Sequence, residues 1–389
     1  MALRAHRETS STITPPLAYR RMVVKAGTNV LTDGAQALDG KVMASLVAQL
    51  VQVRRMGAQV VLVTSGAIAA GREALGQAGG QDGRSVAASQ VLAAVGQSRL
   101  MHQYQELFSR HETSVAQALL TRHDLEDRSG YLNIRNTLEG LLQRGVVPVV
   151  NENDVVNVEE IGPEGFGDND QLSALVANLI DADLLLLLTD TKGLYTADPH
   201  RDQSAQLVPV VEQIDDSVLA QASEYHSATT RGGMRSKLKA ARLATSAGVT
   251  VAIVSGAEPQ VVCRVAQGET VGTLFPSSVS HMESRKRWML SGLSESKGEV
   301  VVDEGAVAAL RTHNGSLLPA GVREVRGQFE RGDLISIVGL HGRRVACGIT
   351  NYAAGDLEAI MGARSSQIHQ RLGHHFGDEV VHRNNMAVL

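Results

Sequence analysis

The alternation of short apolar segments with longer amphipathic ones over residues 20–275 constrains this chain more than any other feature of its sequence. The apolar segments show almost no polar alternation, which is typical of strands buried on both faces of a sheet. The strands that this pattern predicts lie at 22–24, 59–63, 114–119, 146–150, 184–188 and 250–254. Helices are predicted between them, at 41–56, 85–110, 128–144, 171–180 and 234–246. Alternation of this kind predicts an α/β fold with a mostly parallel sheet sandwiched by helices.

The character of the chain changes after residue 275. Residues 276–297 are rich in Ser, Glu and Arg and are interpreted as a linker. Short apolar runs separated by glycines follow at 298–376, which predicts a compact β-rich domain, a small barrel. The polar residues 1–19 are interpreted as a disordered leader without a secretory signal, and residues 377–389 as a C-terminal tail. We therefore expect two folded domains.

Composition excludes several classes of protein. The 37 Lys and Arg residues against 41 Asp and Glu residues give a formal net charge of −4, which argues against a dedicated binder of polyanions. No apolar run approaches the roughly 18 residues that a membrane-spanning helix needs. The two cysteines, Cys263 and Cys347, lie 84 positions apart, which excludes a disulfide framework and a cysteine-rich zinc site. This cysteine usage fits a reducing compartment, so we expect a cytoplasmic protein.

Three familiar motifs are incomplete or missing. The glycines at 66 and 71 have the spacing of a phosphate-binding P-loop, but Arg72 and Glu73 stand where that loop carries Lys and a hydroxyl. His111 and Glu112 lack the second histidine of a zinc-binding helix. No Gly-x-Gly-x-x-Gly motif follows a predicted strand, so a dinucleotide-binding fold has no support. We assign no metal ligand.

Polar and glycine-rich motifs follow the predicted strands, at the end where ligands bind in open parallel sheets. They lie at 25–28, 64–67, 151–154, 167–170, 189–190 and 231–237. Three of them lead into predicted helices, whose N-termini attract anions. Because the carboxyl ends of parallel strands share one edge of the sheet, we expect all six motifs to line one crevice.

Each motif also has an ordinary structural interpretation. Ser65 and residues 168–169 are typical of helix caps, and the glycines at 232–233 are typical of a turn. Lys237 is a weaker candidate than Lys25, because it lies one turn into a predicted helix and is also compatible with the protein surface. Lys25 is different, because a lysine at the end of a buried strand needs an anion to offset its loss of hydration. The order and spacing of the six motifs together favour the functional interpretation.

The motifs together fit phosphoryl transfer. Lys25, Lys237 and glycine-rich backbone amides can neutralise a transferring phosphoryl group. Carboxylates in the motifs between the two lysines can orient the lysines and bind Mg²⁺. No His or Cys lies in the motifs as a general base, but a carboxylate acceptor is already ionised at pH 7 and needs none. The sequence therefore favours a kinase that makes an acyl phosphate.

The same motifs resemble the glutamate 5-kinases of the amino acid kinase family. The segments that carry the resemblance lie at 23–28, 63–72, 92–99, 150–154, 166–170, 187–190, 192–195, 232–237 and 283–288. The resemblance covers nearly the whole chain after the leader, and residues 298–376 are similar to a PUA domain. It implies an amino-acid-kinase fold that transfers a phosphoryl group from Mg·ATP to the side-chain carboxylate of L-glutamate. The product would be L-glutamyl 5-phosphate, made in the first step of proline biosynthesis.

The resemblance implies a role for each matching residue. The catalytic residues would be Lys25 and Lys237, which stabilise the transferring phosphoryl group, and Asp170, which holds the two lysines in place. Glutamate would be bound by Ser65, Asn151, Asp154, Asp168 and Asn169. ATP would be held by Lys25, Thr189, Asp190, Arg231, Gly232, Gly233, Met234, Arg235, Ser236 and Lys237.

The resemblance also implies cofactors, an assembly and an inhibitor. ATP and Mg²⁺ are the expected cofactors, and a homo-oligomer inhibited by proline is the expected assembly.

The chain departs from the family pattern at a few positions. Arg231 stands where the family usually has Thr before the glycine pair, and a further Arg follows at 235. Ala26 replaces a larger aliphatic residue. The arginines concern the affinity for ATP and not the reaction.

Two other interpretations stay open. A sister kinase that phosphorylates the carboxylate of aspartate or N-acetylglutamate fits the same motifs. PUA-like domains also occur in RNA-binding proteins, but residues 298–376 hold eight arginines, no lysine and eight acidic residues. A nucleic-acid-binding face normally shows an excess of basic residues. We therefore expect no nucleic-acid partner and no membrane partner.

Overall fold

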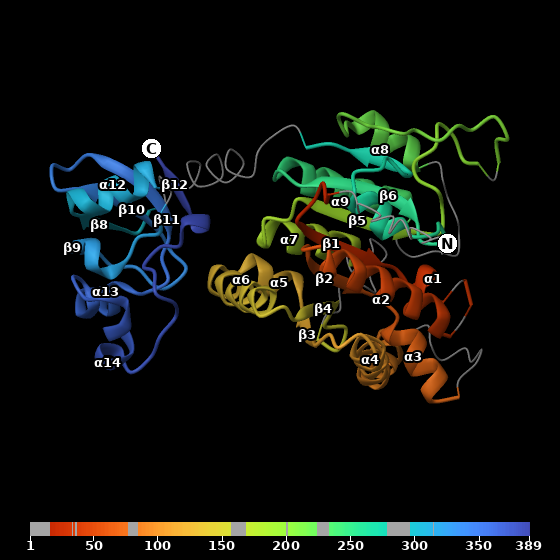
Figure 1. Cartoon of the computed structure of the whole chain (residues 1–389), viewed down its shortest axis with the longest axis horizontal. Coiled ribbons are helices and arrows are strands. Elements are labelled where there is room, and N and C mark those ends of the chain that lie inside the picture. The colour runs from red at the N-terminus through yellow and green to blue at the C-terminus, as the bar shows by residue number, and fades with distance from the viewer. Residues whose placement is uncertain are drawn as a thin grey trace, which may run out of the picture.

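The computed structural model of the chain describes residues 16–32, 34–35, 37–76, 85–156, 169–199, 201–223, 233–277, 296–313 and 315–389. These residues build two sheets, each covered by its own helices, which lie next to each other in Figure 1. The predicted leader and linker lie outside the described residues, except at 16–19, 276–277 and 296–297. None of the helices in the described ranges is both long enough and apolar enough to cross a bilayer.

Seven strands form the larger sheet, in the order β3-β4-β2-β1-β5-β6-β7. They are β1 (Arg21–Ala26), β2 (Gln59–Thr64), β3 (Val115–Leu120), β4 (Val147–Glu152), β5 (Leu184–Thr189), β6 (Thr250–Ser255) and β7 (Thr273–Phe275). Neighbouring strands are parallel except β6 and β7. The predicted α/β fold with a mostly parallel sheet is confirmed. The short β7 is an antiparallel edge strand that the apolar pattern did not reveal.

Helices cover both faces of this sheet (Figure 1). They are α1 (Thr28–Leu31), α2 (Gly40–Arg55), α3 (Ala67–Ala74), α4 (Val86–Ser109), α5 (Arg122–Glu126), α6 (Arg128–Gln143), α7 (Asn169–Leu179), α8 (Asp216–Ser223), α9 (Met234–Ser246) and α10 (Val261–Ala266). Five of them match the predicted helices within two residues at each end. The others are short, and too few apolar positions repeat in them to give a clear period.

Alternate side chains of each strand enter two separate cores. In β1, Met22 and Val24 pack with α2, α4 and α10, while Val23 packs on the opposite face with α6, α7 and α9. The all-leucine part of β5, residues 184–188, divides between the same two cores in the same way. Burial on both faces explains why these strands are apolar throughout.

A five-stranded sheet with the order β12-β11-β10-β8-β9 forms the C-terminal domain. Its elements are β8 (Gly298–Val302), α12 (Glu304–Thr312), β9 (Val322–Gly327), β10 (Leu334–Gly339), β11 (Arg344–Ile349), α13 (Ala354–Ile360), α14 (Ile368–Leu372) and β12 (Met386–Val388), with short 3₁₀ turns at Pro319–Gly321, Ser365–Gln367 and Arg383–Asn385. The β-rich domain is confirmed. Its sheet extends past residue 376, because β12 pairs with β11 and Val380 and Val381 are fully buried. The interpretation of 377–389 as a tail is therefore wrong, since this segment completes the sheet.

Helix α6 joins the two domains. Its Leu132 is fully buried in a cluster with Leu334 and Cys347, which lie on β10 and β11 of the C-terminal sheet. One turn further along α6, the buried Arg135 donates to a backbone carbonyl at the end of α7 and pairs with Asp181 at 2.6 Å. The helix that supports the C-terminal domain is thus anchored directly in the larger domain.

Two glycines allow α3 and α4 to cross in direct backbone contact. A Cβ atom on Gly96 of α4 would lie 1.8 Å from the carbonyl oxygen of Ala67, and one on Gly71 of α3 would lie 1.9 Å from that of Leu92. No side chain fits in either place. The crossing fixes α3, which follows directly after the loop that carries Ser65, against the long helix α4.

We predict that Gly96→Ala lowers the free energy of unfolding by about 1–3 kcal/mol, because the methyl group forces two helix backbones apart. The measurement is a thermal melt of the full chain. Gly355→Ala is the matched control, since Gly355 lies in α13 with no atom within 4 Å of the added Cβ. There the better helix propensity of Ala leaves the melting temperature unchanged or raises it. Equal melting temperatures for the two variants would contradict the crossing as described.

Candidate active site

The polar motifs meet at the carboxyl edge of the large sheet. In the parallel ladders Lys25 lies beside Val63 on one side and Leu187 on the other, so the ends of β1, β2 and β5 are level. On β4, Asn151 and Glu152 still belong to the strand and are buried. The structure therefore brings these motifs to one edge, as the topology of a parallel sheet requires.

Three charged side chains form the centre of this edge. Asp170, with no exposed surface, lies between Lys25 and Lys237, at 2.5 Å from one ammonium nitrogen and 3.2 Å from the other. Lys25 and Lys237 are themselves only 4 % and 7 % exposed. We call these three residues the lysine–aspartate cluster. Its net charge is positive, so it suits an anionic group.

The charge state of Asp170 follows from its surroundings. Burial acts to raise the pKa of the carboxyl group, but the nearby ammonium groups of Lys25 and Lys237 outweigh burial and hold the pKa below its ordinary value. The carboxylate is therefore ionised at neutral pH, and both its oxygens face lysines. Asp170 is thus unsuited to accept a proton as a general base.

Each member of the lysine–aspartate cluster comes from a different element. Lys25 is in β1, Asp170 is the second residue of α7, and Lys237 lies in the first turns of α9. Helix α9 begins after Gly233 without a side-chain cap. Its first backbone N–H groups therefore point towards the same edge as the two lysines, where an anion is favoured. The alternative interpretation of Lys237 as a surface residue is wrong, because its side chain is buried.

A chain of amide and hydroxyl hydrogen bonds lies beside the cluster. Asn169 donates from Nδ2 to Ser65 Oγ at 2.9 Å and to Asn151 Oδ1 at 3.2 Å. Asn151 in turn donates from Nδ2 to Oε1 of Gln97 at 2.8 Å. Ser65 is not a helix cap, because the cap of α3 is Gly66 in a left-handed conformation. We call these four residues the amide network.

Gln97 is the residue of this network that sequence reasoning missed. It lies in one of the segments that carry the family resemblance, but nothing in its local pattern marks it as functional. Two atoms of the network, Gln97 Nε2 and Asn169 Oδ1, are buried without a hydrogen-bond partner among the described residues. A buried donor and a buried acceptor without partners are costly, so their presence indicates a place for a polar ligand.

A second carboxylate borders the cluster on the side of β5. Asp190 accepts hydrogen bonds from Asn29 Nδ2 and from Thr189 Oγ1, both at 3.0 Å. Burial acts to raise the pKa of Asp190, but these hydrogen bonds hold it below its ordinary value. The backbone of Thr189 is fixed by a hydrogen bond from the N–H of Gly256. Asn29 is thus another neighbour of the site that the sequence did not reveal.

Other expected site residues lie outside the described residues or at the margin of the site. Asp168, Arg231 and Gly232 lie outside the described residues. Asp154 follows β4 in a turn and is partly buried. Met234, Arg235 and Ser236 form the first turn of α9, with Arg235 exposed. Within the described ranges no three His, Cys, Asp or Glu side chains gather as a metal site would require.

We predict that Asp170→Asn lowers the free energy of unfolding by about 3–5 kcal/mol, because it leaves two buried ammonium groups without their anion. A thermal melt against wild type measures this. The exposed pair between Asp216 and Arg242 supplies the control, since Asp216→Asn should cost less than about 1 kcal/mol. Comparable losses for the two variants would contradict a structural role for the cluster.

The same substitution predicts a pH dependence. The pKa of Asp170 is lower in the folded protein than in the unfolded chain, so its contribution to stability is complete at neutral pH. It is lost as the pH falls below about 4. The difference in melting temperature between wild type and Asp170→Asn should therefore shrink in acid. A difference in melting temperature that grows as the pH falls would contradict this prediction.

Comparison with known proteins agrees with this geometry. Residues 20–255 match the amino acid kinase family, and residues 298–372 match the PUA domain. A glutamate 5-kinase of Dehalococcoides mccartyi (strain CBDB1) is 48 % identical over 371 residues, covering 95 % of this chain and 99 % of its own. A glutamate 5-kinase of Shewanella amazonensis is 50 % identical over 371 residues, covering 95 % and 96 %. One of Deinococcus radiodurans is 46 % identical over 369 residues, covering 95 % and 100 %.

The matches extend over both domains. An identity near one half over almost the full length leaves no room for a different fold or domain order. The chain therefore belongs to the amino acid kinase family and, within it, to the glutamate 5-kinases, with a PUA domain at its C-terminal end.

Proposed function

We propose that this protein is a glutamate 5-kinase enzyme, which transfers the terminal phosphoryl group of ATP to the side-chain carboxylate of L-glutamate. The product is L-glutamyl 5-phosphate, and the reaction is the first step of proline biosynthesis. The observation that carries the proposal is the buried lysine–aspartate cluster at the carboxyl edge of the sheet, in a chain about half identical to glutamate 5-kinases. An assay of ATP consumption with glutamate, aspartate and N-acetylglutamate tests it. Turnover with glutamate alone is the expected result.

The two lysines act on the transferring phosphoryl group. In phosphoryl transfer the protein chiefly positions the reactants and neutralises charge, and there is little covalent chemistry for it to do. Lys25 and Lys237 pair with different carboxylate oxygens of Asp170, which fixes the separation of the two ammonium groups. Asp170 is a positioning residue in this mechanism. The acceptor carboxylate is ionised at neutral pH, so no general base is required.

The amide network fits the glutamate substrate. Ser65, Asn151 and Asn169 present hydroxyl and amide groups beside the phosphoryl site, and the two unpaired atoms of the network offer one donor and one acceptor. The donor suits a carboxylate oxygen and the acceptor suits an ammonium hydrogen. We propose that Asp154, and Asp168 beyond the described residues, pair with the ammonium group of glutamate.

ATP is proposed to lie along β5 and the N-terminus of α9. Three sets of groups fit a triphosphate. They are the ammonium group of Lys25 on β1, the uncapped first turn of α9, and the side chains of Thr189 and Asp190. We also assign residues 233–237 to ATP, together with Arg231 and Gly232, which lie outside the described residues. When bound, Mg²⁺ neutralises charge on the phosphates. Such an ion would need few protein ligands, because Mg²⁺ usually keeps several waters.

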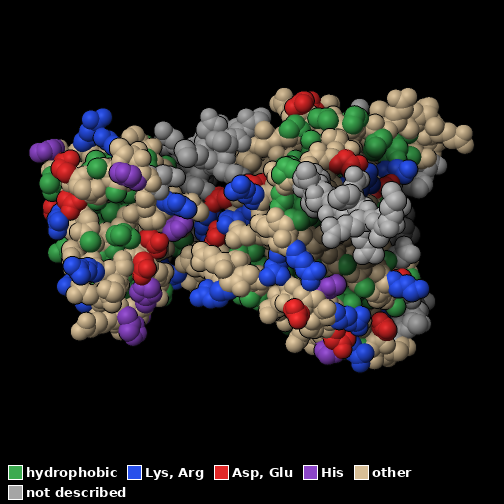
Figure 2. Space-filling view, in the orientation of Figure 1, with side chains coloured by type: hydrophobic (Ala, Val, Ile, Leu, Met, Phe, Trp, Pro, Cys, Tyr) green, Lys and Arg blue, Asp and Glu red, His purple; other side chains and the backbone are tan. Residues whose placement is uncertain are grey.

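Nucleic-acid binding by the C-terminal domain has less support. Arg323 pairs with Asp303 at 2.7 Å, and Arg326 pairs with Glu299 and Glu324 at 2.9 and 2.8 Å. On the face seen in Figure 2, basic side chains of this domain are interspersed with acidic and histidine side chains and form no continuous basic patch. A homo-oligomer and feedback inhibition by proline remain proposals that rest on family membership.

We predict that Lys25→Met lowers kcat by about 10²–10³-fold and changes the KM for glutamate by less than about threefold, because the ammonium group serves the transition state. Steady-state kinetics with both substrates measure this. Lys239→Met is the control on α9, since Lys239 is exposed two residues beyond the buried Lys237. A rise in KM with an unchanged kcat would make Lys25 a residue of ground-state binding instead.

We predict that Gln97→Leu raises the KM for glutamate about 5–30-fold, because it removes the acceptor that orients the Asn151 amide. The KM for ATP should stay within about twofold of wild type, since the network lies outside the proposed ATP site. Ser98→Ala, at the exposed neighbouring position, is the control. Equal increases in the KM for both substrates would point to a general loss of structure and would refute this role for Gln97.

A further inference from the structure

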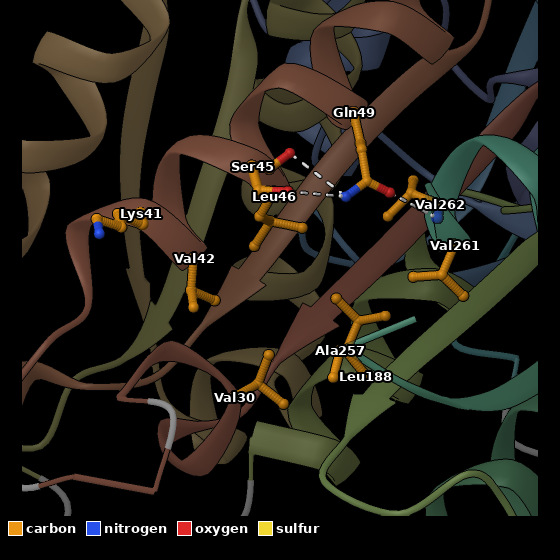
Figure 3. A pocket seen from close by; sticks show the side chains of 11 residues that line it. Val30, Lys41, Val42, Ser45, Leu46, Gln49, Leu188, Ala257, Val261 and Val262 are labelled. Atoms are coloured by element: carbon orange, nitrogen blue, oxygen red, sulfur yellow. Dashed lines mark hydrogen bonds between the residues drawn. The ribbon is translucent and has the colours of Figure 1, made fainter. Parts of the chain in front are cut away.

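A cavity of about 260 Å³ lies behind the proposed ATP site (Figure 3). It is bordered by α1, α2, the N-terminal end of α10, the end of β5 and the chain that follows β6. None of the residues assigned above to glutamate or ATP lines it. The cavity is therefore separate from the proposed glutamate and ATP sites.

The floor and one wall of this cavity are aliphatic. Val30, Leu46, Leu188 and Val261 point into it from four different elements (Figure 3). Leu188 and Val261 are almost fully buried as parts of the core around α2. Aliphatic side chains from rigid elements make a surface that favours a small hydrocarbon group over water.

The other wall carries a line of polar groups along α2. Lys41, Ser45 and Gln49 follow one another at intervals of four residues, so they lie on one face of the helix over about 12 Å. Gln49 is only 6 % exposed, and its Oε1 accepts a hydrogen bond from the N–H of Val262 at 3.0 Å. This bond fixes the amide and turns Nε2 towards Ser45.

The Gln49 amide nitrogen has only weak acceptors. It reaches the carbonyl oxygen and the hydroxyl of Ser45 at 3.4 Å each, which is longer than an ordinary N–H···O bond. Lys41 lies at the rim, is exposed, and pairs with no carboxylate in the part of the chain that the structure describes. The Gln49 donor, with its poor acceptors, lies next to the Ser45 hydroxyl, and Lys41 is one helical turn before Ser45 on the same face of α2.

We propose that this cavity binds a small aliphatic carboxylate. The carboxylate lies over Ser45, where Gln49 Nε2 can donate to it and the flexible side chain of Lys41 can reach it. The hydrocarbon part lies against Val30, Leu188 and Val261. The volume of the cavity, below the 300 to 1,000 Å³ or so of drug-sized sites, limits the ligand to a short branched or cyclic chain.

The cavity shares a wall with the proposed ATP site. The single turn of α1 presents Val30 to the cavity and Asn29 to Asp190 on its other side. Gly256 links the same two places, because its N–H is bonded to the Thr189 carbonyl and a Cβ on it would lie 2.6 Å from Val30. An occupant that moves Val30 therefore also moves groups next to ATP. This coupling rests on the proposed function, whereas binding itself does not.

Isocaproate is the probe for binding, and its neutral amide, isocaproamide, is the comparison. Methyl-labelled valine and leucine resonances of the full chain are followed by NMR as each compound is added up to about 20 mM. We expect isocaproate to shift the methyl signals of Val30, Leu188 and Val261 with saturation. The amide should bind at least about two- to fivefold more weakly, because it lacks the charge that pairs with Lys41.

Two variants test the assignment. Lys41→Gln should weaken isocaproate about two- to fivefold and leave isocaproamide unchanged. Ala257→Phe, at an exposed position on the rim, should abolish binding of both by filling the cavity. Lys239→Gln is the control for loss of a surface charge. No saturable shifts in wild type, or equal binding to wild type and Ala257→Phe, would overturn the proposal.

Kinetics separate this inference from the proposed function. In wild type, isocaproate should change the KM for ATP and leave the KM for glutamate unaltered, and in Ala257→Phe it should change neither. A lack of kinase activity in the absence of any probe would refute the proposed function and leave the NMR result intact. Saturable methyl shifts without a change in the KM for ATP would overturn the coupling.

Discussion

Asp170 is fully buried and pairs with the ammonium groups of both Lys25 and Lys237. The arrangement of the large domain depends on this contact. Each of the three charges would be very costly to bury alone. They come from β1, α7 and α9, so the sheet and two helices must be placed correctly before the charges compensate one another. The net positive charge that remains suits a phosphoryl group. The packing that compensates the buried charges is therefore the same packing that the proposed chemistry needs.

The positions of the other site residues follow from close packing around this centre. The bare backbones of Gly71 and Gly96 let α4 lie directly on α3. That contact brings Gln97, the next residue of α4, to the buried end of β4, where it orients Asn151. A glycine contact with no chemistry of its own thus sets the geometry of the amide network.

Two helices, α1 and α6, connect the site to the rest of the molecule. Helix α1 separates the proposed ATP site from the aliphatic cavity, with Asn29 on one side and Val30 on the other. Helix α6 carries the PUA domain on Leu132 and leads directly into β4, which ends at the amide network. Each helix offers a physical path to the neighbours of the lysine–aspartate cluster.

The sequence alone determined the fold class, the six motifs and the family, because apolar periodicity and strand-end motifs are local properties of the chain. The strand ends were placed too early, since Asn151 and Thr189 interrupt an apolar run but still pair in the sheet. Only the tertiary structure revealed Gln97, the strand β12 and the aliphatic cavity. Gln97 meets Asn151 across 54 residues of chain, and β12 pairs with a strand about 40 residues before it. Contacts of that separation depend on how helices and strands pack together, which no local pattern encodes.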